Sequence, residues 1–260
     1  MTTSAWSVRE LARVFDAVDW IVPPYIQLGV LRQLAARIEA ASAEDKHGVL
    51  EEELGSIYDP SDIAVMLLER YAKTRHVADF KPAIAEAIEA AHLGMFHAAV
   101  STLLPVVEGV IRKIATARGQ SVGNGTKKLV DEIDALITQQ HVTGGGAAIE
   151  RVEMLESFRD FLKSKLLEHT SKYAGAGELN RHGILHGVFS TFGHEWNFYK
   201  VLSFLDLLCF FIAISTNISA LAPHRTPESE RLASYYRQLS AVRAMAIASG
   251  ARLGSTQGLP

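Results

Sequence analysis

One apolar stretch, VLSFLDLLCFFIAISTNISAL at 201–221, constrains the fold more than any other part of the sequence. A helix of this length can cross a bilayer. However, Asp206 and Asn217 lie within the stretch, and an unpaired aspartate in lipid costs about 2.5–3.5 kcal/mol on insertion scales. A helix that is apolar on most sides also occurs at the centre of a soluble bundle. We therefore expect a buried central helix and no membrane association.

Most of the remaining chain also shows the spacing of amphipathic helices. Apolar residues recur at intervals of three and four, and no run alternates at period two for long enough to predict a strand. Helices are expected at 7–22, 25–41, 43–58, 59–74, 81–93, 95–117, 126–141, 147–173, 201–221 and from 227 onward. The sequence thus predicts an all-α fold, a helical bundle with additional N-terminal helices.

Local signals support several of these boundaries. Ser7 and Glu10 have the spacing of a capping box, and a Pro-Pro pair at 23–24 ends the first helix. Asp59 and Thr226 each stand directly before a proline, the pattern of an N-cap followed by the first helical turn. These boundaries are therefore predicted from chemistry as well as from periodicity.

Composition narrows the classes of function. The chain has 260 residues, 48% of them hydrophobic, so it can bury a sizeable core. Its net charge of −3 argues against a generic nucleic-acid coat, which needs a strong basic field, but leaves room for a small basic site. Cys209 is the single cysteine, which excludes an intrachain disulfide and a cysteine-based zinc motif.

Three parts are expected along the chain. They are an N-terminal helical region of unknown role at 1–76, a helical bundle at 77–222, and a C-terminal helix with a flexible tail at 223–260. The first ten residues, MTTSAWSVRE, lack the basic patch and apolar run of a signal peptide. We therefore expect a cytoplasmic protein.

The stretch ELNRHGILHG at 178–187 concentrates groups that hold phosphate or move protons. Asn180 can cap a helix that starts at Arg181, and a helix start beside an arginine favours phosphate binding. His186 lies five residues after Arg181, which is about 140° around an ideal helix. The two side chains then do not share a face, so either the helix start is irregular, as Gly183 permits, or a second copy of the chain completes the site.

The segment Arg181-His182-Gly183-Ile184-Leu185-His186 resembles the Arg-x(4–6)-His signature of HEPN-superfamily helical proteins. Two flanks strengthen the resemblance: FYKVLSFLDLL after the motif, and AAHLGMFHAAVSTLLPVVEGVIRKIA upstream, where Glu108 holds the acidic position before a glycine. The resemblance covers about 80–220. It implies a HEPN-like bundle and says little about residues 1–75.

Many HEPN proteins are metal-independent endoribonucleases that act as toxins or anti-phage effectors, commonly as homodimers. The resemblance implies that Arg181 holds the phosphate and that His186 acts in acid–base catalysis, leaving a 2′,3′-cyclic phosphate. His182 would fill the polar slot of the motif, and Glu108 would orient Arg181 or a histidine. In some HEPN toxins a tyrosine two residues after the histidine is modified by a partner enzyme. Here that residue is Val188, so this mode of control is not expected.

A basic segment between Gly109 and Val130 is a candidate surface for the phosphate backbone of RNA. It holds five basic residues and no acid, namely Arg112, Lys113, Arg118, Lys127 and Lys128. We expect Arg118, Lys127 and Lys128, together with Asn180, to contact RNA. A solvated basic loop explains the same composition equally well.

Other interpretations stay open at this point. The chain can be a catalytically inactive HEPN module that binds RNA or a protein partner, such as an antitoxin or a regulator. Glu108 and Arg112 have the spacing of an ordinary helix salt bridge, and Arg181 can pair with Glu178 or Glu108. His182 and His186, with His194-Glu195 downstream, suggest zinc but lack the His-Glu-x-x-His order. We therefore expect neither a metal nor a cofactor.

Overall fold

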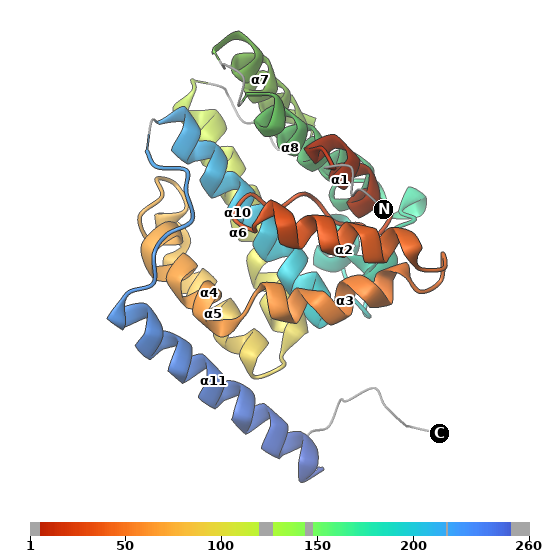
Figure 1. Ribbon diagram of the computed structural model, residues 1–260, viewed down its shortest axis with the longest axis vertical. Helices are drawn as coiled ribbons and strands as arrows, with labels where there is room; N and C mark the ends of the chain where they lie inside the picture. The colour runs from red at the N-terminus through yellow and green to blue at the C-terminus, as the bar shows by residue number, and fades with distance from the viewer. Residues whose placement is uncertain (1–5, 120–126, 144–147, 217, 251–260) are drawn as a thin grey trace.

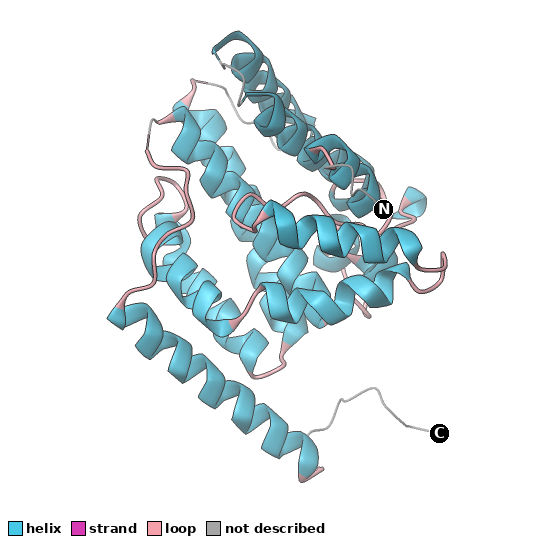
Figure 2. Cartoon of the chain, in the orientation of Figure 1, coloured by secondary structure: helices cyan, strands magenta, loops and turns pink. Residues whose placement is uncertain are grey.

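The computed structural model describes residues 6–119, 127–143, 148–216 and 218–250, and it confirms the all-α fold. The protein is 74% helical, and no strand occurs in the described ranges (Figure 2). The main helices are α1 (Val8–Asp16), α2 (Leu28–Ala40), α3 (Lys46–Ile57), α4 (Pro60–Val65), α5 (Lys81–His92), α6 (Phe96–Ala117), α7 (Lys127–Thr143), α8 (Ala148–Phe161), α9 (Arg181–Leu185), α10 (Glu195–Ser215) and α11 (Pro227–Ala248). Two π-helical turns, Met66–Tyr71 and Leu162–Leu166, extend α4 and α8.

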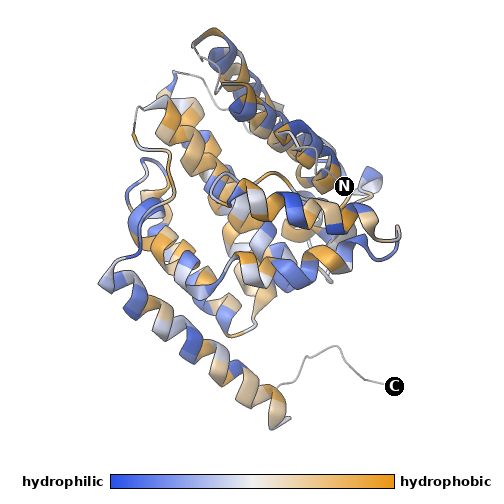
Figure 3. Ribbon diagram, viewed as in Figure 1, coloured by the Kyte–Doolittle hydropathy of each residue, from blue (hydrophilic) through white to orange (hydrophobic). Residues whose placement is uncertain are grey.

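Helix α10 runs through the middle of the bundle and carries most of the apolar run (Figures 1 and 3). It spans Glu195–Ser215 rather than the expected 201–221. Within the described ranges it is the one helix long and apolar enough to cross a membrane, and 83% of its most apolar stretch is buried inside the protein. The expected central helix is therefore present, shifted toward the N-terminus.

The first helix is shorter than its periodicity predicts. Helix α1 ends at Asp16, and the next residues turn back onto α10 instead of continuing the helix. The indole nitrogen of Trp20 donates to the Ser203 hydroxyl at 3.1 Å, and the buried Lys200 ammonium donates to the Val18 carbonyl at 2.7 Å. These long-range hydrogen bonds fix a turn where the local pattern alone favours a helix.

The chemical start signals are confirmed. Ser7 and Glu10 form a reciprocal capping box at α1, and the Asp59 carboxylate accepts two backbone N–H bonds at the start of α4. Thr226 caps α11 in a second capping box. Gly94 separates α5 from α6 and has a φ of 73°, a conformation that glycine adopts without steric cost.

Every helix from α1 to α11 contributes residues to one buried core. Helix α9 contributes through its buried part, and its C-terminal end is exposed. Helices α1 and α2 pack together, α1 also packs on α8, and α3 packs on α10. Helix α11 lies along one edge of the protein against α4 and α5 (Figure 1). The division into parts at residues 76 and 222 stays a prediction.

Candidate functional site

Asn180 fixes the start of the motif segment, by which we mean residues 180–192. Its side-chain oxygen accepts the Gly183 N–H at 2.8 Å, which confirms the expected N-cap. Its amide nitrogen donates to the carbonyls of Lys165 at 2.9 Å and Glu168 at 2.8 Å. The residue is fully buried. In this structure Asn180 therefore positions α9 and is out of reach of an RNA, in contrast to the contact expected from the sequence.

The helix that Asn180 caps is very short. Helix α9 spans only Arg181–Leu185, and His186 is its C-cap with φ of −101° and ψ of 6°. One turn and a half of helix carries little macrodipole, so the helix start expected to attract phosphate adds little here. What the short helix does provide is a fixed relation between His182 and His186. Their rings lie parallel, 6.0 Å apart between centroids.

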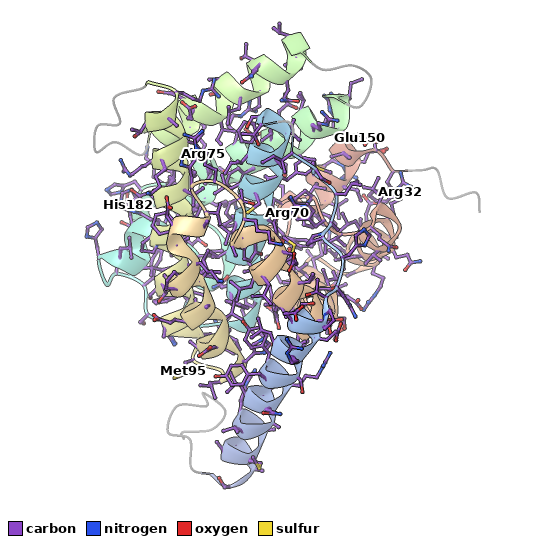
Figure 4. All side chains as sticks on the ribbon, turned by 90° about the vertical axis from the view of Figure 1, so that its left-hand side faces the viewer. Arg32, Arg70, Arg75, Met95, Glu150 and His182 are labelled. Atoms are coloured by element: carbon purple, nitrogen blue, oxygen red, sulfur yellow. The ribbon has the colours of Figure 1, made fainter. Side chains whose placement is uncertain are left out.

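Arg181, His182 and His186 form a continuous row. A guanidinium nitrogen of Arg181 lies 3.4 Å from Nδ1 of His182, and His182 in turn faces the ring of His186. Burial lowers the pKa of His182, and the neighbouring Arg181 and His186 lower it further. Figure 4 shows His182 at the periphery of the protein, and His186 is exposed. The row therefore runs from the half-buried Arg181 to the exposed His186.

Glu108 anchors the inner end of this row. Its carboxylate accepts from Nε of Arg181 at 2.9 Å and from Arg112, four residues along α6, at 2.6 Å. Both of the pairings that the sequence left open for Glu108 are thus present. Burial alone raises the pKa of Glu108, but the two arginines outweigh it and hold the pKa below its ordinary value. Glu108 is an ionised anchor that fixes the orientation of Arg181.

A close contact between Gly183 and Phe189 shapes the outer side of the segment. A Cβ added to Gly183 would meet the Phe189 ring at 2.1 Å. The backbone N–H groups of Val188 and Phe189 both donate to the Gly183 carbonyl, at 2.8 and 3.0 Å. Gly183 is therefore needed for close packing of the following loop, not for an irregular start of α9.

Two contacts that the sequence did not predict hold the rest of the loop. Nε2 of His97 lies 2.9 Å from the Ser190 carbonyl, and the Thr191 N–H donates to Glu178 at 2.6 Å. Glu178 therefore stabilises the loop by accepting from Thr191, and it does not pair with Arg181. His97 stands out in the sequence only as one more histidine in the upstream flank, because its partner is a backbone carbonyl 93 residues away.

The basic segment before α7 is partly neutralised within the chain. Three of its five basic residues face a carboxylate: Arg112 with Glu108 at 2.6 Å, Lys113 with Asp79 at 2.8 Å, and Arg118 with the buried Glu132 at 2.9 Å. Lys127 and Lys128 begin α7, and their side chains lie outside the described part of the structure. Arg118 is thus engaged in an ion pair rather than free to meet RNA.

A small cavity lies beside the inner end of the row. The cavity lined by Glu108 and Arg181 measures about 10 Å³, which is near the lower limit for one water molecule. Among the described residues, no three His, Cys, Asp or Glu side chains come together as metal ligands. His194 instead stacks on Trp196, with 3.9 Å between ring centroids. The expected absence of a metal stays a prediction.

Comparisons with known proteins give no information about the function of this site. No family model, no curated protein and no solved structure matches the chain.

Proposed function

We propose that the protein is a metal-independent endoribonuclease of the HEPN type, with the role of a toxin or an anti-phage effector. The observation that supports this proposal is the row of Arg181, His182 and His186, anchored on the ionised Glu108. A histidine can transfer the protons in the transesterification of RNA, and a fixed cation can stabilise the charge that develops on the phosphate.

Each group in the row has a role that follows from its contacts. Glu108 binds Nε of Arg181, which leaves the terminal nitrogens of the guanidinium to hold phosphate. Because Nδ1 of His182 faces the Arg181 cation, the ring carries its proton on Nε2 and donates from there to a phosphate oxygen. His186 is the exposed residue of the row, and we assign it the transfer of the proton from the ribose 2′-OH.

The reaction proceeds by attack of the ribose 2′-oxygen on the adjacent phosphorus. A histidine takes the 2′-OH proton, the new O–P bond forms, and the bond to the 5′-oxygen breaks. The leaving oxygen receives a proton from a second acid. The products are a 2′,3′-cyclic phosphate and a free 5′-OH, and neither metal nor cofactor is consumed.

A homodimer supplies the second acid most simply. Two-fold symmetry places the same segment of both chains at one interface, and a groove between two copies of the row would hold one RNA strand. The exposed apolar side chains of Leu185 and Val188, at 40% and 61% exposure, flank His186. Burial of these two side chains favours a dimer contact through the motif segment.

The test is cleavage of a structured RNA in EDTA, with analysis of the product ends. We expect cyclic phosphate ends, and a loss of about 10²–10⁴-fold in rate for His186→Ala, the usual scale for an acid–base group. His141→Ala is the matched control, because His141 is an exposed histidine at the end of α7. Cleavage that requires Zn²⁺ or Mg²⁺, or an unchanged rate in His186→Ala, rejects the proposal.

A second candidate is a catalytically inactive HEPN module that binds RNA or a protein partner such as an antitoxin. The ion pairs of Arg181 and Arg118 favour it, since both cations already face carboxylates. In that case binding weakens steeply with salt, is lost when Lys127 and Lys128 are changed to glutamate, and is unaffected by His186→Ala. Toxicity in cells that disappears with His186→Ala alone rejects this candidate.

A further inference from the structure

A second concave site lies on another part of the protein. A cavity of about 460 Å³ opens between the start of α2, the end of α3, α4 with its π-helical turn, and α10. Its walls include Tyr25, Tyr58 and Tyr71, and Asp206 of α10 lies among them. We call it the tyrosine pocket. Its volume is within the range of pockets that bind small organic ligands.

Buried hydroxyl groups in this pocket lack the hydrogen bonds that burial demands. The hydroxyls of Tyr25 and Tyr58 are inaccessible and form no hydrogen bond of normal geometry, although Ser203 and Asp206 lie close enough to Tyr58 to affect its pKa. Tyr71 differs, because its hydroxyl donates to Asp206 at 2.5 Å. Buried polar groups are nearly always satisfied. The Tyr58 hydroxyl has Ser203 and Asp206 beside it, so it is the Tyr25 hydroxyl that indicates a missing partner.

The charge of the pocket is one-sided. Its lining includes three carboxylates, Glu53, Asp62 and Asp206, and no Lys, Arg or His among the described residues that form it. Glu53 and Asp62 are already paired, with Arg37 and Arg225 respectively. Asp206 is 2% exposed and forms no ion pair with another described residue. The charge of the buried Arg70, whose guanidinium lies 5.1 Å from the centre of the Tyr25 ring, acts on it from outside the pocket lining. A buried carboxylate without a counter-ion is costly.

We infer that the tyrosine pocket binds a small organic cation, a primary or methylated ammonium group on an apolar body. The ammonium pairs with Asp206, and the tyrosine rings surround it in the manner of an aromatic cage. The apolar body packs against Ile26, Ile57 and Met66, which line the same cavity. This binding is independent of RNA cleavage, because none of the motif residues lines the pocket.

The state of Asp206 links binding to pH. Burial raises the pKa of Asp206 to about 7, against the opposing effects of the hydrogen bond from Tyr71, the nearby Tyr58 hydroxyl and the charge on Arg70. Tyr25 and Cys209 also lie near enough to interact with this carboxylate, and Glu53 and Asp62 lie on the pocket wall. A bound cation favours the ionised carboxylate. Affinity should therefore rise as the pH increases through 7.

The experiment compares three probes of similar shape and different charge by isothermal titration calorimetry with the full chain. They are 2-phenylethylammonium, the neutral 2-phenylethanol and the anionic 3-phenylpropanoate. At pH 8 we expect the ammonium to bind about ten-fold or more tighter than the alcohol, which corresponds to one cation–carboxylate interaction of about 1.4 kcal/mol. The anion should not bind.

Variants of the chain separate the cation site from a merely apolar pocket. Asp206→Asn should reduce the affinity for the ammonium to that for the alcohol, while Glu53→Gln should leave it unchanged, because Glu53 already faces Arg37. Val30→Trp, at an exposed position on the rim, should block the ammonium and the alcohol without changing the core. It keeps the test valid if Asp206→Asn does not fold. Equal affinity for ammonium and alcohol, or no binding of the ammonium at millimolar concentration, overturns the inference.

Discussion

The motif segment and the tyrosine pocket both gather titratable side chains, but they are built in opposite ways. The motif segment places Arg181, His182 and His186 within six consecutive residues, on a short helix at the surface. The pocket brings together Tyr25, from the turn before α2, and Asp206 of α10, which are far apart in the chain. The first kind of site is visible in a sequence because its members are neighbours there. The second kind exists only after the chain has folded.

The two sites also differ in what they contribute to stability. An exposed histidine such as His186 makes few contacts, so its replacement should change the free energy of unfolding by less than about 0.5 kcal/mol. Asp206 is enclosed, and a change there acts on the fold through desolvation and through its bond to Tyr71. We therefore expect variants at exposed positions of the motif segment, such as His186, to change activity, and variants of the pocket to change stability and ligand binding.

The largest expected effect concerns the motif segment. Arg181→Ala and His186→Ala should each lose about 10²–10⁴-fold in RNA cleavage, with melting temperatures close to that of the unchanged protein for His186→Ala. If one site combines Arg181 of one chain with His186 of the other, a mixture of the two variants should regain part of the activity. The measurement is the cleavage rate as a function of mixing ratio.

The structure sharpens this test, because Arg181, His182 and His186 already form a row within one chain. A row that acts within one chain gives no recovery in the mixture, whereas a composite site does. Sedimentation supplies the control for assembly. A fully active monomer contradicts the dimeric site, although it leaves the roles of the individual residues intact.

The second prediction concerns the pH dependence of stability that Asp206 imposes. Its pKa is raised by burial to about 7 in the folded chain, from 3.8 when unfolded. The folded state then binds more protons between these two pH values, so the stability that the neutral carboxyl contributes is complete below about pH 4 and is lost as the pH rises through 7. At 1.36 kcal/mol per pKa unit, the loss amounts to at most about 4 kcal/mol.

Asp206→Asn should abolish this dependence, because an amide does not titrate and its oxygen still accepts from Tyr71. Urea unfolding at pH 5 and pH 8 measures it: the variant should gain stability relative to the unchanged protein at the higher pH. Glu53→Gln is the control, since its carboxylate lies at an exposed ion pair. An identical pH dependence in Asp206→Asn and the unchanged protein contradicts the assignment.

Much of the fold could be predicted from the sequence, because helical periodicity and caps are local properties. Ser7, Asp59, Asn180 and Thr226 all act as the expected N-caps. The end of α1 could not be predicted, since Trp20 is drawn to Ser203 by a hydrogen bond across 183 residues. Local signals fix where helices begin, whereas long-range contacts decide where some of them stop.

In the candidate site, too, local features could be predicted from the sequence and long-range contacts could not. The cap at Asn180 and the residues of the row were visible in the sequence, and the pairing of Arg181 with Glu108 was one of two open alternatives. The ion pairs of Lys113 and Arg118 were not predicted. Their partners are Asp79, in a turn before α5, and Glu132 of α7, and both lie outside the basic segment. The number of basic residues in a segment therefore overestimates how many of them are free to bind an anion.

The third prediction tests the anchor of the row. Glu108→Ala removes the carboxylate between Arg112 and Arg181 and leaves two partly buried cations together. Loss of one partner of a buried pair costs about 3–5 kcal/mol, but these three side chains keep 13–27% exposure. We therefore expect a smaller loss, about 1–2 kcal/mol in urea unfolding, and a reduced cleavage rate because Arg181 is no longer held.

Glu108→Asp and Glu108→Gln separate charge from shape at this position. If Glu108 positions Arg181, the rate of RNA cleavage should fall by about ten-fold in Glu108→Gln, within the range expected for a displaced catalytic group. The affinity for RNA, which Arg181 holds through a phosphate, should fall as well. Lys113→Ala removes a nearby exposed ion pair and serves as the matched control. A normal cleavage rate in Glu108→Gln shows that Glu108 contributes to the stability of the fold and has no role in cleavage.

The smallest expected effect tests whether packing at Gly183 maintains the row. Gly183→Ala adds a methyl group that meets the Phe189 ring at 2.1 Å, and overpacking of this kind costs about 1–3 kcal/mol. The gain in helix propensity of alanine over glycine, about 1 kcal/mol, offsets part of this cost. The net loss should be about 1 kcal/mol. Because the displaced ring belongs to the loop after His186, cleavage should fall more than this loss of stability explains.

The double variant Gly183→Ala with Phe189→Leu decides the cause. A smaller side chain at 189 leaves room for the methyl group, so both stability and cleavage should return toward the values of Phe189→Leu alone, which is the control. A comparable change in the pocket, such as Ile57→Val, removes one methyl group and should alter stability without altering cleavage. If Gly183→Ala lowers stability and leaves cleavage unchanged, the loop does not hold His186 in place, and the row of side chains acts without it.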